Sequence, residues 1–223
     1  MPSLNGLLLV DKPRGMTSFD VIRRIRRASR DQKIGHAGTL DPDASGLLVL
    51  CFGKATKMAG GLTASDKIYE VEFTLGVRTD TFDSTGTVLE EKPCDVQRDA
   101  LLAALQTFTG TLQQTVPIYS AVKIEGRRLY EYARKNIAVD LPTKEVQIHG
   151  IELMAFENPH GKIRVHCSKG TYVRSLAPWR GGDDDAYPPD SKRNVPGQRC
   201  HRFGRAFGRG KHRGSASTIP PGS

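Results

Sequence analysis

The sequence predicts a globular protein of mixed β-strands and α-helices. Residues 67–75 carry apolar side chains at every second position, as in a strand with one buried face. Residues 18–28 instead repeat apolar side chains at helical spacing, and residues 47–52 form an apolar run typical of a buried strand. A chain of 223 residues is long enough for one domain with a sizeable core.

The remaining elements follow from local sequence signals. Thr17 is expected to cap the first helix, and Asp95 is expected to cap a later one. The polar turn 76–83 contains acids that we expect to bind the local backbone or basic neighbours. The other expected elements are strand 6–10, a helix over 54–62, a helix near 101–108, a helix over 127–134 and a hairpin of strands 146–156 and 162–167.

The charge of the chain favours a polyanionic partner such as nucleic acid. The formal net charge is +9 and the pI is about 9.5. Residues 178–223 hold nine Lys and Arg against four Asp, so they contribute +5 of that charge. Basic and aromatic residues also interleave over 127–134, which fits either RNA contact or an ordinary surface helix.

Cysteine and histidine spacing argues against a disulfide framework and against a metal site. The four cysteines show no Cys-x-x-Cys pair, and the six histidines show no ligand spacing. No stretch of the sequence is apolar enough to cross a membrane, and we expect a reduced cytoplasm as the compartment.

The loop at residues 35–46 is the strongest candidate for a functional site. It contains three glycines, and Asp41 stands directly before Pro42 between two apolar runs. A carboxylate on a stiff turn suits a nucleophile or a base. By pattern alone, the same Asp-Pro pair also fits a simple loop with a local hydrogen bond.

This loop resembles the active-site loop of the TruB family, the tRNA pseudouridine-55 synthases. The shared string is Gly-His-Ala-Gly-Thr-Leu-Asp-Pro-x-Ala-Ser-Gly. The resemblance implies that Asp41 is the catalytic nucleophile, whereas Asp43 stands at a position that the family varies. It also implies that His36 contacts the RNA, although an imidazole there could simply bond locally.

Further motifs resemble the same family in the same order. A Leu-Leu-x-x-Asp-Lys-Pro-x-Gly-Met-Thr-Ser string gives Lys12 a supporting role beside the catalytic loop. Lys-x-Tyr-x-Val implies that Tyr69 stacks on the target uracil, although its place on an apolar face also fits a core residue. Cys-Ser-x-Gly-Thr-Tyr-Val-Arg implies that Tyr172 packs beside the uracil and that Arg174 pairs with Asp41, for which we expect a bidentate contact.

The resemblance covers roughly residues 5–177 and implies the α+β pseudouridine synthase fold. This fold has a mixed, mostly antiparallel sheet with flanking helices and a central cleft. The implied reaction isomerises uridine to pseudouridine in the T-loop of tRNA on a flipped-out base, with no cofactor and no metal. We expect a monomer with tRNA as its partner and no membrane contact.

The composition changes abruptly after residue 177. Residues 178–223 contain eight Gly and six Pro but no Leu, so we expect a disordered tail. Residues 1–177 then form a catalytic domain that is incomplete at its C-terminal end, and no C-terminal RNA-binding domain is visible. A reading-frame shift near codon 177 would explain the break, and the chain as written would then be poorly stable and weakly active.

Two other functions remain open at this point. The chain could bind or remodel tRNA without catalysis, since its last part departs from the family. Alternatively, Asp41 and Asp43 could form the carboxylate pair of a glycoside hydrolase, although two residues around a proline need not converge on one ligand.

Overall fold

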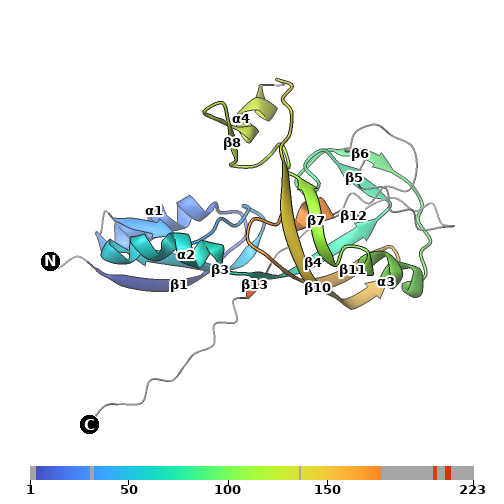
Figure 1. Cartoon of the computed structure of the whole chain (residues 1–223), viewed down its shortest axis with the longest axis horizontal. Helices are drawn as coiled ribbons and strands as arrows, with labels where there is room; N and C mark the ends of the chain where they lie inside the picture. The colour runs from blue at the N-terminus through green and yellow to red at the C-terminus, as the bar shows by residue number, and fades with distance from the viewer. Residues whose placement is uncertain (1–3, 31–32, 136, 177–202, 205–208, 212–223) are drawn as a thin grey trace, which may run out of the picture.

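A nine-stranded β-sheet forms the centre of the molecule (Figure 1). The computed structural model describes residues 4–30, 33–135, 137–176, 203–204 and 209–211. The strand order is β1-β3-β13-β4-β11-β10-β7, with β2 paired to β3 and β12 paired to β4. Among the described residues, no helix is long and apolar enough to span a lipid bilayer.

The strands of the large sheet come from the whole length of the chain. They are β1 (Gly6–Lys12), β2 (Ile34–His36), β3 (Ser45–Phe52), β4 (Lys67–Leu75), β7 (Gly110–Thr115), β10 (Thr143–Glu157), β11 (His160–Cys167), β12 (Phe203–Gly204) and β13 (Arg209–Lys211). Two small sheets pair β5 (Val77–Thr79) with β6 (Val88–Glu91) and β8 (Lys123–Ile124) with β9 (Arg127–Arg128).

The helices are short and follow the predicted order. They are α1 (Ser18–Ser29), α2 (Ala59–Ala64), α3 (Arg98–Gln106) and α4 (Leu129–Arg134), with 3-10 turns η1 (Gly53–Met58) and η2 (Val173–Leu176). The helix expected over 54–62 therefore begins as the 3-10 turn η1. The helix expected over 127–134 begins two residues later, because Arg127 and Arg128 form strand β9.

Helix α1 begins as the sequence predicts. The Thr17 side chain accepts a hydrogen bond from the backbone N–H of Asp20, and the Asp20 carboxylate accepts one from the N–H of Thr17. This reciprocal pair satisfies two donors that the first turn cannot pair internally. Val21 and Ile22 are buried on the inner side of the helix.

Strand β3 is buried on both faces, which explains its unbroken apolar sequence. Leu48, Leu50 and Phe52 pack in one cluster with residues of α1 and β2. Val49 and Cys51 belong to a second cluster, against which residues of η1 and α2 pack. Helices α1 and α2 therefore cover opposite faces of β3.

A larger core lies under the other half of the sheet. Val71, Phe73 and Leu75 of β4 alternate toward this core as predicted, and Leu101 and Leu105 of α3 pack on it. The N-cap of α3 is Gln97, which makes no side-chain capping bond. The expectation that Asp95 caps this helix is therefore wrong.

The observed sheet confirms the predicted α+β class. Every strand pair in it is antiparallel except β13 with β3, so the sheet is mixed and mostly antiparallel. The predicted hairpin is β10–β11, which pairs from Ile148 to Glu157 with two register shifts.

Five residues of the segment beyond 177 pair with the sheet. Backbone pairing places Gly210 of β13 between Gly46 of β3 and Tyr69 of β4. Phe203 of β12 pairs with Leu75 at the far end of β4. These five residues are short strands rather than disordered chain. The rest of 178–223 lies outside the described residues, so the predicted domain boundary and tail remain predictions.

Candidate active site

The loop that carries Asp41 is anchored immediately before the aspartate. It leaves β2 and returns into β3, and these two strands pair with each other from Ile34 to His36. The hydroxyl of Ser18, at the start of α1, accepts a hydrogen bond from the N–H of Leu40 at 3.0 Å. The same hydroxyl contacts the carbonyl of Leu40 at 3.3 Å. Both polar groups of the residue before Asp41 are thus held by one side chain.

The residue after Asp41 is anchored by the predicted supporting lysine. Lys12 is fully buried, and its ammonium donates to the carbonyl of Pro42 at 3.1 Å. It also donates to the carbonyls of Pro13 and Met16, at 3.0 and 2.7 Å. Burial lowers the pKa of Lys12, and the negative charges of nearby aspartates, Asp41 foremost, oppose that change. Lys12 therefore ties the turn at 13–16 to the loop.

Arg174 joins the Asp41 loop to the other half of the sheet. It lies in η2, and only 8% of its side chain is exposed. Its Nη1 lies 3.5 Å from an Asp41 carboxylate oxygen and 3.3 Å from an Asp83 carboxylate oxygen. Its Nη2 donates to the carbonyl of Tyr119 at 2.6 Å. The predicted pairing with Asp41 is present, but it is a single contact shared with Asp83 and not a bidentate one.

Asp41 sits in a crowded but accessible position. Its side chain is 53% exposed. Surrounding protein atoms raise its pKa by partial desolvation, while the positive charge of Arg174 lowers the pKa and the negative charge of Asp83 raises it again. The net shift is upward, so the charged form of Asp41 is poorly solvated compared with an ordinary surface aspartate.

Asp83 is a charged neighbour of Arg174 that sequence reasoning did not single out. Its carboxylate accepts hydrogen bonds from the Thr81 hydroxyl at 2.8 Å, and from the N–H and hydroxyl of Thr85 at 3.0 and 2.6 Å. Burial opposes its ionisation, but the Thr85 and Thr81 bonds and the Arg174 charge prevail and lower its pKa. The expectation that acids of this turn bind locally or to basic neighbours is confirmed at Asp83.

Tyr69 lies on the apolar face of β4 and close to the charge of Asp41. Its backbone pairs with Val165 of β11, and its half-buried ring packs against the larger core. Burial raises the pKa of its hydroxyl, and the charges of Cys167 and Asp41 add to that rise. The Tyr69 hydroxyl is therefore protonated at neutral pH.

Tyr172 is held by its backbone rather than by its ring. The side-chain amide of Gln114, which is buried, accepts from the N–H of Tyr172 at 2.8 Å and donates to its carbonyl at 3.0 Å. The Arg174 guanidinium carbon lies 5.9 Å from the centre of the Tyr172 ring. Gln114 thus fixes the segment that carries both Tyr172 and Arg174.

His36 makes a local contact. Its Nδ1 lies 2.6 Å from the carbonyl oxygen of Gly38, at the start of the same loop. A carbonyl only accepts hydrogen bonds, so Nδ1 carries the proton. An outward contact of His36 would then use Nε2, and the predicted RNA contact stays a prediction.

A basic and aromatic extension projects from the sheet. Figure 1 shows α4 and β8 at the top of the view, away from the large sheet. The guanidinium carbons of Arg128 and Arg134 lie 5.9 and 5.2 Å from the centre of the Tyr130 ring. The extension is held together by buried Leu129 and by a hydrogen bond from the Tyr132 hydroxyl to a β8 carbonyl.

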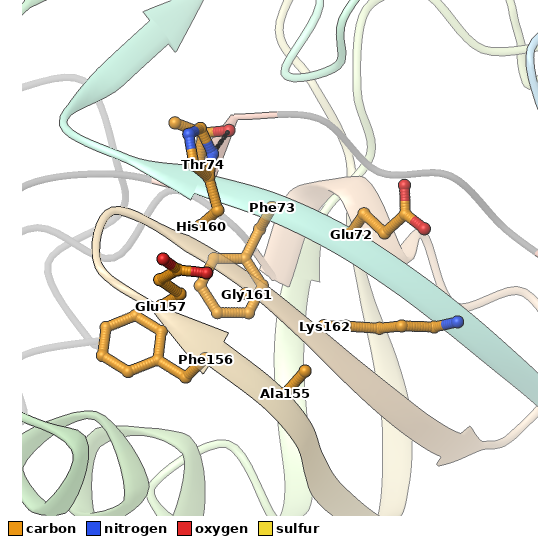
Figure 2. Close-up of a pocket in the computed structure, with 9 residues that line it drawn as sticks. All are labelled: Glu72, Phe73, Thr74, Ala155, Phe156, Glu157, His160, Gly161 and Lys162. Carbon is orange, nitrogen blue, oxygen red and sulfur yellow. Dashed lines mark hydrogen bonds between the residues drawn. The ribbon is translucent and has the colours of Figure 1, made fainter.

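A pocket of about 520 Å³ lies elsewhere, lined by residues of the adjacent strands β4, β10 and β11 (Figure 2). Phe73 and Phe156 stack across it with ring centres 6.4 Å apart. None of the predicted site residues lines it. Its lining residues are Glu72, Phe73, Thr74, Ala155, Phe156, Glu157, His160, Gly161 and Lys162.

Solved structures share this arrangement of strands and helices. A crystal structure of a Cbf5-Nop10-Gar1 complex matches with a TM-score of 0.58 and 29% sequence identity, over 77% of this chain and 42% of that chain. A structure of an H/ACA RNP bound to a substrate RNA containing 2'-deoxyuridine matches with a TM-score of 0.56 and 26% identity, over 77% and 40%. The chain has the pseudouridine synthase fold.

Sequence comparison defines the family. Residues 26–173 match the model of the TruB family pseudouridylate synthase N-terminal domain. The chain is 43% identical to the tRNA pseudouridine synthase B of Clostridium kluyveri over 78% of its length, and 49% identical to that of Azoarcus sp. over 78%. It spans 60% and 58% of the lengths of these two relatives. The chain belongs to the TruB family.

Proposed function

We propose that the protein isomerises uridine to pseudouridine in the T-loop of tRNA, at position 55. The observation that carries this proposal is the placement of Asp41, in which an accessible carboxylate lies 3.5 Å from the buried guanidinium of Arg174. Membership of the TruB family supports the reaction class. The relatives named above are tRNA pseudouridine synthases, which supports tRNA as the substrate.

Asp41 acts as the nucleophile in this proposal. Its poorly solvated carboxylate is a better nucleophile than a fully hydrated one. Attack at ribose C1′ and attack at uracil C6 both suit an ionised carboxylate. The N1–C1′ bond breaks, the base turns, and a C5–C1′ bond forms. The proton lost from C5 is balanced by one gained at N1, so the isomerisation exchanges no electrons with a cofactor.

The neighbouring side chains hold the base and the nucleophile. Tyr69 stacks on the flipped uracil, and its protonated hydroxyl is suited to donate a hydrogen bond rather than to act as a phenolate base. Tyr172 packs beside the base from the segment that Gln114 fixes. His36 contacts the RNA through Nε2. Lys12 holds the loop through its hydrogen bond to the Pro42 carbonyl.

The extension around α4 supplies a surface for the tRNA. Arg128, Tyr130 and Arg134 combine positive charge with an aromatic face, which suits both phosphates and unstacked bases. The net charge of +9 adds a general attraction to RNA. We propose that the chain acts as a monomer in the cytoplasm, where tRNA is modified.

A tritium-release assay tests the proposal. The whole chain, in excess over tRNA labelled at C5 of uridine, should release tritium in a single turnover. A tRNA with cytidine in place of the uridine at position 55 serves as the control and should release none. Tight tRNA binding without release would instead support the non-catalytic alternative.

Tyr69→Phe separates stacking of the ring from the hydrogen bond of the hydroxyl in the same assay. The ring still stacks, so tRNA affinity should change little, while the single-turnover rate should fall by about tenfold or more. A loss of affinity at an unchanged rate would show that Tyr69 serves only in packing. A glycoside hydrolase would release free uracil rather than tritium, so an assay of free base in the same reaction distinguishes this alternative from isomerisation.

A further inference from the structure

Two histidines and one aspartate meet on the surface of the large sheet, and none of them belongs to the catalytic loop. The Nε2 atom of His149 lies 3.1 Å from a carboxylate oxygen of Asp66, and the Nε2 atom of His166 lies 4.0 Å from the same oxygen. The two imidazole rings are tilted by 49° with centres 4.6 Å apart. One ligand atom from each of the three residues lies within 4.8 Å of the other two.

The backbone brings these residues together in a way that sequence spacing does not reveal. His166 lies in β11, His149 lies in β10, and Asp66 stands directly before β4. In the register of β10 and β11, Ile148 pairs with Cys167 and Gly150 pairs with His166, so His149 is an extra residue at a bulge. A bulge redirects a side chain, and here it leaves the His149 ring beside that of His166.

The distances fit a divalent transition metal. In a tetrahedral site with ligands about 2.0–2.1 Å from the ion, neighbouring ligand atoms lie roughly 3.3–3.4 Å apart. The His149–Asp66 distance of 3.1 Å is close to that value, and the His166–Asp66 distance of 4.0 Å is longer, so binding would require the exposed His166 ring to move closer. Two imidazoles and a carboxylate form a donor set that suits Zn²⁺, Co²⁺ or Ni²⁺ better than Mg²⁺ or Ca²⁺.

We propose that Asp66, His149 and His166 form a binding site for one Zn²⁺-class ion, with water completing the coordination. The side chains are 34–50% exposed, which leaves room for the water ligands and implies modest affinity. The ion would link β4, β10 and β11 at the end of β11 from which the Tyr172 and Arg174 segment departs. Metal binding would therefore stabilise the fold beside the active site without entering the isomerisation.

The experiment uses the whole chain without an affinity tag. Isothermal titration with Zn²⁺ should show one ion bound per chain with micromolar affinity. Asp66→Asn, which keeps the shape of the side chain, and His166→Ala should each weaken binding by about 10- to 100-fold, since changes even outside the first shell of a metal have effects of this size. His160→Ala is the matched control, because His160 is an exposed β11 histidine whose ring contacts Thr74 instead.

Two further readouts separate this site from cysteine binding and from misfolding. The Co²⁺ complex should show ligand-field absorption without the sulfur-to-cobalt charge-transfer band of a thiolate ligand. Zn²⁺ should raise the melting temperature of the parent chain and of His160→Ala but not that of Asp66→Asn. Equal Zn²⁺ affinity in the parent and Asp66→Asn chains, or a thiolate band with Co²⁺, would overturn the proposal and leave a simple His–Asp contact.

Discussion

The Asp41 loop and the Asp83 turn each present a carboxylate to the same nitrogen of Arg174, yet the pKa values of the two carboxyl groups shift in opposite directions. Asp83 accepts three hydrogen bonds from Thr81 and Thr85, its side chain is 14% exposed, and its pKa is lowered. Asp41 is 53% exposed, it contacts Arg174 at 3.5 Å, and its pKa is raised. The charge of Asp83 is stabilised by donors that it already binds, whereas the charge of Asp41 is not.

This difference in hydrogen bonding explains how Arg174 can contact two carboxylates that have different roles. A carboxylate saturated with donors is a poor nucleophile, because attack would require those bonds to break. Asp83 and the Tyr119 carbonyl hold Arg174 in place, and Arg174 then presents a fixed positive charge to Asp41. We infer that Asp83 anchors the arginine and Asp41 reacts. The variants below test this division.

Asp41→Asn should produce the largest change. An amide of nearly the same size is a poor nucleophile, so the rate of pseudouridine formation should fall by at least about 10³-fold while tRNA affinity stays close to normal. Tritium release and filter binding measure the two quantities. A variant that still turned over at a near-normal rate would remove Asp41 from the reaction.

The same variant has a second effect on stability, with a sign that follows from the raised pKa. A carboxyl group whose pKa is higher in the folded state loses stability as the pH rises through that pKa. The amide cannot ionise, so Asp41→Asn should melt at a higher temperature than the parent at neutral pH. The difference should vanish below the usual carboxyl range, where Asp41 is protonated in both states.

Arg174→Lys should have the next largest effect. A lysine keeps the charge but cannot contact two carboxylates and the Tyr119 carbonyl at fixed angles. The catalytic rate should fall by roughly 10²-fold. Arg164→Lys is the matched control, because Arg164 also contacts two acids, Glu70 and Glu152, but lies outside the candidate site with 38% of its side chain exposed. Equal losses in both variants would show that the effect is not specific to the site.

Asp83→Asn should reverse the stability effect of Asp41→Asn. Asp83 has a lowered pKa, so the stability it provides is present above the usual carboxyl pKa and is lost as the pH falls through the lowered one. At neutral pH the variant should be less stable by roughly 1–3 kcal/mol, because Arg174 and the threonine donors lose a charged acceptor. Chemical denaturation at neutral and acidic pH measures this difference.

Asp83→Asn should also shift the pH dependence of the reaction. The negative charge of Asp83 raises the pKa of Asp41, so its removal should move the acid limb of kcat/KM to lower pH. The parent chain should lose activity as the pH falls through the raised pKa of Asp41. An acid limb that stayed fixed in Asp83→Asn would contradict the assignment of that limb to Asp41.

Much of the fold could be predicted from local sequence, and much of the candidate site from resemblance. The alternation of residues 67–75 and the Thr17 capping signal are local patterns, and both are confirmed. The motif resemblance named Asp41 and Arg174, and the structure brings these two together. Their roles in the reaction remain predictions.

The residues that were missed make their contacts across long stretches of chain. Asp83 meets Arg174 across 91 positions, and Gln114 meets Tyr172 across 58. No periodicity reports such contacts, because they depend on how strands pair. A usable signal did exist at Asp83, since flanking threonines in a polar turn are suited to hold a carboxylate. Asp95 failed as a cap because the chain enters α3 two residues later, at Gln97.

Ser18→Ala should give the smallest effect, and it tests whether the Asp41 loop depends on neutral backbone anchors. The Ser18 hydroxyl accepts from the N–H of Leu40, and its loss leaves a partly buried donor without its bond. Stability should fall by about 1 kcal/mol. The rate should fall by several-fold at an unchanged acid limb, since Lys12 still holds Pro42 and the burial and charges that act on the pKa of Asp41 are kept. A shifted acid limb in Ser18→Ala would mean that the Ser18 bonds also control the desolvation that raises the pKa of Asp41.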